Sequence, residues 1–281
     1  MIPTTFSYER AESIDHAIEL LGAHEDAKLL AGGHSLLPLM KLRLARPAVL
    51  IDLGRVGGMS GVRDAGDHIV VGALTRHHDL NNDAVARQAC PLLAHTAGMV
   101  GDPQVRHRGT IGGSVAHGDP ASDLPTVCLA LDASFVLRGP RGERTVAARD
   151  FFIGFFETAL APDEILTEIR VPKHDGVGWS YLKFCRRSID WATVGVAAVV
   201  SARNGTVVDA KIALTNMGLT PLRASAVEAA LAGAPRDAVN AAAERADDGT
   251  DPPADTWGSA DYRRHLARIL VGRAVEESLG R

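Results

Sequence analysis

The sequence has few cysteines, few aromatic residues and no strong net charge. Cys90, Cys128 and Cys185 are far apart, and none belongs to a Cys-x-x-Cys pair. This argues against an iron–sulfur cluster or a structural zinc held by this chain. Aromatic residues make up 5% of the sequence, too few for an aromatic-rich binding platform. The formal net charge of −4 supplies no basic field for nucleic acid. We therefore expect no metal site and no nucleic-acid partner.

Long hydrophobic runs are also missing. The longest apolar stretch, residues 192–202, falls short of the roughly 20 residues that a membrane helix needs, and it is typical of a buried strand. The N-terminus has no charged region followed by an apolar run, so no signal peptide is expected. Scattered cysteines fit a reducing compartment. These absences predict a cytoplasmic protein with no transmembrane segment.

The 281 residues are enough for two domains, and a hydrophobic content of 46% allows a real core. Turn-forming residues cluster over 172–178, which predicts a boundary between a domain of residues 1–175 and one of residues 176–281. Periodicity predicts helices over 13–22, 75–100 (with breaks near 81–82 and at 91), 223–231, 236–246 and 262–279. Strands are predicted over 28–30, 48–53, 68–73, 133–137, 143–146, 165–171, 178–186, 192–201 and 207–215.

Two glycine-rich turns, about eighty residues apart, are the most informative positive feature. Glycine permits positive φ and a close backbone approach to a ligand. Successive backbone N–H groups in such a turn can converge on an anion. Either turn alone would be interpreted as structural, and neither fits a GxGxxG or Walker pattern. Together they predict a diphosphate held from two sides. The first turn is Ala31, Gly32, Gly33, His34 and Ser35, and the second is Thr110, Ile111, Gly112, Gly113 and Ser114.

The surroundings of these turns make the chain recognisable. It closely resembles the FAD-binding medium subunit of bacterial molybdenum hydroxylases, a family that includes carbon monoxide dehydrogenase and, more distantly, xanthine dehydrogenase. The resemblance spans nearly the whole chain. It is carried by residues 31–38 (AGGHSLLP), 40–47 (MKLRLARP), 103–106 (PQVR), 108–114 (RGTIGGS), 119–125 (DPASDLP), 160–166 (LAPDEIL), 181–184 (YLKF) and 259–263 (SADYR).

This resemblance implies an α+β fold with FAD as the cofactor. A PCMH-type FAD-binding domain of two α+β subdomains would be followed by a C-terminal α+β domain with an antiparallel sheet and helices. The resemblance assigns the backbones of both glycine turns to the diphosphate of FAD. It also places Asp123, Leu160 and Lys183 around the flavin and its ribityl chain.

Asp123 and Lys183 each have a second interpretation that does not involve a cofactor. Asp123 could be the N-cap of a helix beginning at Leu124 and Pro125, because Asp and a first-turn Pro suit those positions. Lys183 could be a surface lysine that extends its charge into water. A cation beside the flavin ring would instead stabilise an anionic reduced flavin.

The histidines near the turns are also ambiguous. His34 could contact FAD through its backbone and hydrogen bonds. In distant enzymes of the same flavin fold, a histidine in a comparable turn instead bonds covalently to the flavin. We expect the first arrangement here, with dissociable FAD. His117 could cap a loop or contact the cofactor. His77 and His78 are expected at the solvated start of a helix. No histidine–carboxylate spacing indicates a metal site.

The resemblance implies an oxidoreductase subunit without a substrate site of its own. Electrons would come from [2Fe–2S] clusters on a small subunit, after oxidation at a molybdopterin-binding large subunit, and pass through FAD to an external acceptor. The assembly would be a dimer of heterotrimers, a heterohexamer. The substrate (carbon monoxide, a purine, another N-heterocycle or an aldehyde) and the acceptor stay open. The alternative is a self-sufficient FAD-dependent oxidase or dehydrogenase, although the alanine-rich C-terminal segment shows no evident acid–base pair.

Overall fold

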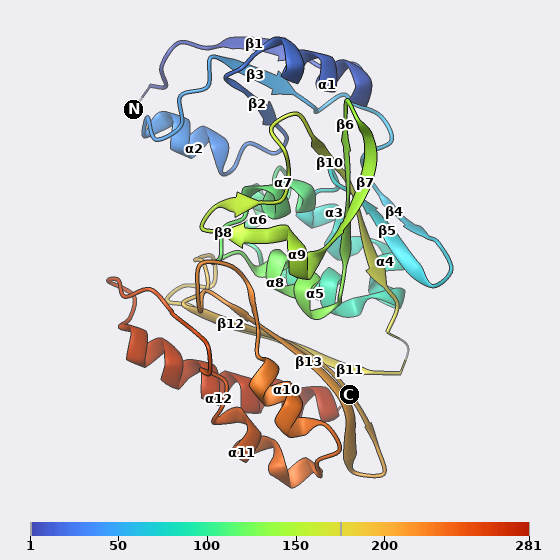
Figure 1. Cartoon of the computed structure of the whole chain (residues 1–281), viewed down its shortest axis with the longest axis vertical. Coiled ribbons are helices and arrows are strands. Elements are labelled where there is room, and N and C mark those ends of the chain that lie inside the picture. Colours follow the sequence, from blue (N-terminus) through green and yellow to red (C-terminus); the bar gives the residue numbers. More distant parts are fainter. Residues whose placement is uncertain (1, 175, 281) are drawn as a thin grey trace.

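The structure is a computed structural model that describes residues 2–174 and 176–280. It arranges three α+β units along the long axis of the molecule, with the N-terminal unit at one end and the C-terminal unit at the other (Figure 1). The α+β fold class is confirmed. The predicted boundary between residues 175 and 176 falls at Asp175, which lies outside the described residues, and it stays a prediction.

The N-terminal unit is a three-stranded parallel sheet in the order β1-β3-β2, with two helices. Ser13 caps the first helix by accepting a hydrogen bond from the His16 backbone N–H at 3.0 Å, as its position before an apolar period predicts. The elements are β1 (Ser7–Arg10), α1 (Ile14–Ala23), β2 (Ala27–Leu30), α2 (Leu36–Lys41) and β3 (Val49–Asp52).

The middle unit is a five-stranded antiparallel sheet in the order β4-β5-β10-β6-β7. The strands are β4 (Val62–Asp64), β5 (His68–Gly72), β6 (Ser134–Gly139), β7 (Gly142–Ala147) and β10 (Ile165–Pro172). A small hairpin joins β8 (Phe152–Gly154) to β9 (Glu157–Thr158). This unit also carries α3 (His77–Asn82), α4 (Ala84–Ala89), α5 (Pro91–Met99), α6 (Pro103–Arg106), α7 (Ile111–His117), α8 (Asp123–Ala130) and α9 (Ala148–Phe151).

Both breaks predicted within residues 75–100 are confirmed, and each has a local cause. The Asp83 carboxylate accepts from the Ala86 backbone N–H and so begins α4 as a separate helix. Pro91 occupies the first turn of α5, where its missing N–H costs no hydrogen bond.

The C-terminal unit is a four-stranded antiparallel sheet covered on one face by helices (Figure 1). Alternate residues of β12 face opposite ways: Val194 and Val196 pack under the C-terminal helices, whereas Ala197 and Val199 join the core of the middle unit. The strand is therefore buried on both faces. The elements are β11 (Gly178–Phe184), β12 (Val194–Arg203), β13 (Thr206–Thr215), β14 (Leu222–Arg223), α10 (Ser225–Leu231), η1 (Arg236–Ala238), α11 (Val239–Ala243) and α12 (Ala260–Leu279).

Helix α8 joins the middle and C-terminal units. Each of its residues, from Asp123 to Ala130, is buried, and the helix contacts β12, β13 and β14 as well as α5 and α7. The two units thus share one packed interface. Within residues 2–174 and 176–280, no helix is long and apolar enough to span a bilayer.

Candidate functional site

The first glycine turn connects β2 to α2. Gly33 has a φ of +77°, which favours glycine, and its carbonyl accepts from the Leu37 backbone N–H at 3.0 Å. Across the described chain, the backbone N–H groups of Gly32, Gly33, His34 and Ser35 have no hydrogen-bond partner. His34 and Ser35 are exposed. A run of open backbone donors at the surface suits an anion.

The second turn leads into α7, and its backbone donors are used within the protein. Ile111 N–H donates to the Thr75 carbonyl at 3.0 Å, and Gly112 N–H to the Ala73 carbonyl at 2.9 Å. Thr110 caps α7: its hydroxyl accepts from Gly113 N–H at 3.1 Å, while its carbonyl accepts from Ser114 N–H at 3.0 Å. We expected both turns to offer open backbone N–H groups to an anion, but in the structure the second turn uses the N–H groups of residues 111–114 within the protein.

The two turns touch each other. A Cβ added to Gly32 would lie 2.8 Å from the Cα of Gly109 and closer still to the Arg108 carbonyl oxygen. A Cβ on Gly113 would lie 4.0 Å from that of Ala31. Segments about eighty residues apart thus form one surface, and Gly32 permits their backbones to meet.

His77 lies beneath the second turn and is buried at 4% exposure, so the expectation of a solvated histidine is wrong here. Its backbone N–H donates to the Gly109 carbonyl at 3.0 Å. Burial, with the nearby charges of Arg106 and His34, lowers the pKa of His77 to about 4. The imidazole is therefore neutral at pH 7, and its Nδ1 has no partner among the described residues. The second turn covers the ring, because a Cβ added to Gly109 would lie 2.9 Å from its Cδ2, and this tertiary contact has no signal in the local sequence.

Helix α7 leads from the second turn to the region of Leu160. The helix ends at Gly118 in a left-handed conformation, where an added Cβ would lie 2.9 Å from Cγ2 of Thr158. The Thr158 hydroxyl accepts from the Leu160 backbone N–H at 3.4 Å. His117 is the last residue of α7, and its ring lies 4.9 Å from that of Phe156. Partial burial lowers the pKa of His117.

Asp123 and Lys183 form a buried ion pair across the domain interface, with Nζ 2.8 Å from Oδ2 and side-chain exposures of 5% and 3%. The second interpretation of each residue, which involved no cofactor, is wrong. Ser122, not Asp123, is the N-cap of α8, and the Asp123 side chain points toward β11. Lys183 is not a surface lysine, since its ammonium group reaches this carboxylate and the Met99 carbonyl. Burial raises the pKa of Asp123, and Lys183 opposes that shift.

Tyr181, two positions before Lys183 on β11, has a role that was not predicted from the sequence. Its hydroxyl donates to Oδ1 of Asp123 at 2.6 Å, so the strand supplies both donors to the carboxylate. The spacing of Tyr181 and Lys183 could have predicted this contact, because residues two apart on a strand face the same side of the sheet.

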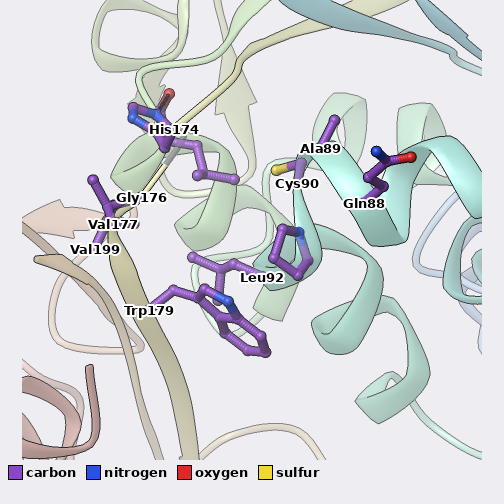
Figure 2. A pocket seen from close by; sticks show the side chains of 11 residues that line it. Gln88, Ala89, Cys90, Leu92, His174, Gly176, Val177, Trp179 and Val199 are labelled. Atoms are coloured by element: carbon purple, nitrogen blue, oxygen red, sulfur yellow. Dashed lines mark hydrogen bonds between the residues drawn. The ribbon is translucent and has the colours of Figure 1, made fainter. Parts of the chain in front are cut away.

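A cavity of about 170 Å³ lies elsewhere, between the α4–α5 junction and the segment entering β11. Figure 2 shows Cys90 and Leu92 facing Trp179 and His174 across it. No predicted site residue lines this cavity. Burial raises the pKa of Cys90 to about 12, so its thiol stays protonated. The cavity is therefore separate from the glycine-turn site.

Two protein families match consecutive parts of the chain. The FAD binding domain in molybdopterin dehydrogenase matches residues 4–174, and the CO dehydrogenase flavoprotein C-terminal domain matches residues 179–278. The carbon monoxide dehydrogenase medium chain of Hydrogenophaga pseudoflava is 45% identical, over 100% of this chain and 99% of its own. The glyceraldehyde dehydrogenase medium chain of Sulfolobus acidocaldarius is 37% identical, over 99% of both chains.

Solved structures agree with the sequence matches. The H. pseudoflava carbon monoxide dehydrogenase that lacks the Mo-pyranopterin moiety superposes with a TM-score of 0.97 and 48% identity, over 100% of this chain and 99% of that chain. The fold and site thus define an FAD-binding oxidoreductase component. The chain belongs to the family of FAD-binding medium subunits of molybdenum hydroxylases, and the resemblance found in the sequence is confirmed.

Proposed function

We propose that this chain is the electron-transfer subunit of a heteromeric molybdenum hydroxylase. It would receive electrons from [2Fe–2S] clusters of a small subunit and deliver them through FAD to an external acceptor. A molybdopterin-binding large subunit would carry the substrate chemistry. The proposed assembly is a dimer of heterotrimers, located in the cytoplasm. The run of unpartnered backbone N–H groups in the first turn is the observation that carries the proposal.

The site residues fit FAD in different ways. The open donors of residues 32–35 suit the charge of its diphosphate. In the second turn the N–H groups of residues 111–114 are engaged, so this turn would contribute close approach at the exposed Gly113 and a hydroxyl at Ser114. Together with Ala31 and His34, these residues would hold the diphosphate. Leu160, Asp123 and Lys183 would lie along the flavin and ribityl part.

Bound FAD supplies the ability to accept and release electrons one or two at a time. The chain's own residues bind it, orient it and hold charge near it. The buried ammonium of Lys183 is neutralised by Asp123, so this pair presents a fixed dipole rather than a free cation. Cys90 and Cys128 are buried, and burial raises the pKa of both thiols, so neither suits a role as a thiolate in electron transfer.

The first test concerns the attachment of FAD. The purified chain should take up FAD and give a visible flavin spectrum, and acid precipitation should release the colour into the supernatant. Colour that stays in the pellet would show covalent attachment, for which the exposed His34 is the candidate. Failure to bind FAD under reconstitution would overturn the proposal.

The second test concerns electron transfer. The FAD-loaded chain, mixed anaerobically with carbon monoxide, purines, other N-heterocycles or aldehydes, should keep the visible absorbance of oxidised flavin. Addition of the two partner subunits should make one substrate bleach it. Rapid, saturable bleaching by an organic substrate without partner subunits would instead support a self-sufficient flavoenzyme. Sedimentation of the mixture would report the proposed heterohexamer.

A further inference from the structure

Three further buried side chains, Tyr181, Thr215 and Thr126, continue the Asp123–Lys183 pair into a polar cluster between the two domains. Tyr181 lies between the carboxylate and Thr215, with its hydroxyl 2.6 Å from Asp123 Oδ1 and 3.2 Å from Thr215 Oγ1. Thr215 is in turn 2.9 Å from the hydroxyl of Thr126. Asp123 and Thr126 belong to α8, whereas Tyr181, Lys183 and Thr215 belong to the C-terminal sheet.

The sheet makes room for this cluster with a glycine. Lys183, Gly195 and Thr215 are paired across β11, β12 and β13. A Cβ on Gly195 would lie 2.7 Å from the Tyr181 hydroxyl oxygen and 2.8 Å from Thr215 Oγ1. The next β12 residue on the same face, Ala197, is also small. Gly195 therefore leaves the space that the two hydroxyl groups occupy.

A buried ion pair adds little stability compared with apolar packing of similar volume. The arrangement instead fixes the orientation of the Asp123 carboxylate. Lys183 holds one oxygen of Asp123 and Tyr181 holds the other, so the plane of the carboxylate is fixed by two donors from one strand. Neither donor belongs to the domain that contains Asp123 and the glycine turns.

We propose that Tyr181 is a positioning residue that fixes the Asp123 carboxylate for contact with FAD, so that docking of the C-terminal sheet completes the FAD site. This inference rests on the proposed role of Asp123 at the flavin and ribityl part. It extends that role to a residue which acts only through Asp123. The remaining lone pairs of the fixed carboxylate are those that would accept hydrogen bonds from FAD.

The test is Tyr181→Phe in the full chain, which removes the hydroxyl and keeps the ring. FAD affinity should fall about tenfold, as expected for loss of one hydrogen bond to a charged group. The visible circular dichroism of bound FAD should also change, because the carboxylate beside it is no longer held. Thr126→Val is the matched control: it removes a hydroxyl of the same cluster that is three hydrogen bonds away from Asp123. It should leave FAD affinity within about twofold.

A double-mutant cycle separates positioning from general packing. In an Asp123→Asn background, Tyr181→Phe should cause little further loss of FAD affinity, because the carboxylate through which it acts is already gone. Equal losses from Tyr181→Phe in both backgrounds would overturn the inference. So would an equal loss from Thr126→Val, or unchanged affinity and dichroism in Tyr181→Phe. Failure of the wild-type chain to bind FAD would contradict the proposed function instead.

Discussion

The two glycine turns have similar sequences and opposite hydrogen-bond states. Residues 32–35 leave their backbone N–H groups without a partner in the described chain. Residues 111–114 give each of theirs to Thr75, Ala73 or Thr110. Each turn begins a helix, yet Ser35 makes no side-chain cap, whereas Thr110 does. The first turn thus has open donors for a ligand, while the second is anchored to the segment that follows β5 and supports the first turn.

This difference shows that glycine can serve two purposes in turns of the same composition. In the first turn it provides a positive φ at Gly33 and a contact surface at Gly32. In the second turn it provides room for packing, because Gly112 lies against Ala73. Substitutions in the second turn should therefore act on folding, and those in the first on FAD.

The largest expected effect is the pH dependence of stability due to His77. Its pKa is about 4 in the folded chain and 6.5 when unperturbed, so the unfolded state binds the extra proton between these values. Stability is then full above pH 6.5 and decreases as the pH falls toward 4, by about 3 kcal/mol. Urea unfolding of His77→Leu across this range should lose that slope. The half-buried His78, as His78→Leu, is the control, and an unchanged slope in His77→Leu would contradict the prediction.

Gly112→Ala should destabilise the fold rather than remove FAD selectively. The new Cβ would lie 2.6 Å from the Ala73 carbonyl oxygen, which also accepts the Gly112 N–H. We expect the free energy of unfolding of the FAD-free chain to fall by about 2 kcal/mol. Denaturant unfolding measures this. Gly57→Ala, whose Cβ would meet nothing within 4 Å, is the control. Unchanged stability with complete loss of FAD would reverse the assignment of the two turns.

Gly32→Ala should weaken FAD binding. Its Cβ would meet the backbone of Arg108 and Gly109, so the turns must separate. A strain of this kind corresponds to a loss of affinity of roughly tenfold, measured by titration of the FAD-free chain. Thermal unfolding without FAD should change less than in Gly112→Ala. An FAD affinity equal to that of the wild-type chain would show that contact between the two turns is not needed for FAD binding.

Thr110→Val should have the smallest effect. It removes the cap on Gly113 N–H and keeps the shape of the side chain. The expected cost is about 1 kcal/mol of unfolding free energy, with Thr110→Ser restoring most of it. A larger loss of FAD affinity than of stability would show that this hydroxyl contacts the cofactor.

Much of the fold could be predicted from local pattern. Asp83 and Pro91 divide the helical region where the sequence places them, and the apolar run of β12 predicts its burial. The short strands β1, β4 and β14 were not predicted. They have two to four residues each, and their positions depend on the strands with which they pair. Such pairing leaves no periodic signal.

The site was predictable in composition but not in its hydrogen bonds. The glycine pairs and the family pattern identify both turns, whereas the second turn's partners Ala73 and Thr75 come from the segment after β5. The burial of His77 and Lys183 could not be predicted from the local sequence either, because it depends on segments far away in the chain that pack against them. A lone polar residue in an apolar stretch has the same sequence signature whether it faces water or a buried partner.

The complete burial of α8 has a consequence for protein engineering. Its residues pack at once on helices of the middle unit and on the strands β12 to β14. A chimera that joins the flavin-binding part of one medium chain to the C-terminal part of another would need matched side chains on both sides of α8. A recombination at the predicted boundary between residues 175 and 176 should therefore also replace residues 123–130 to suit the new sheet.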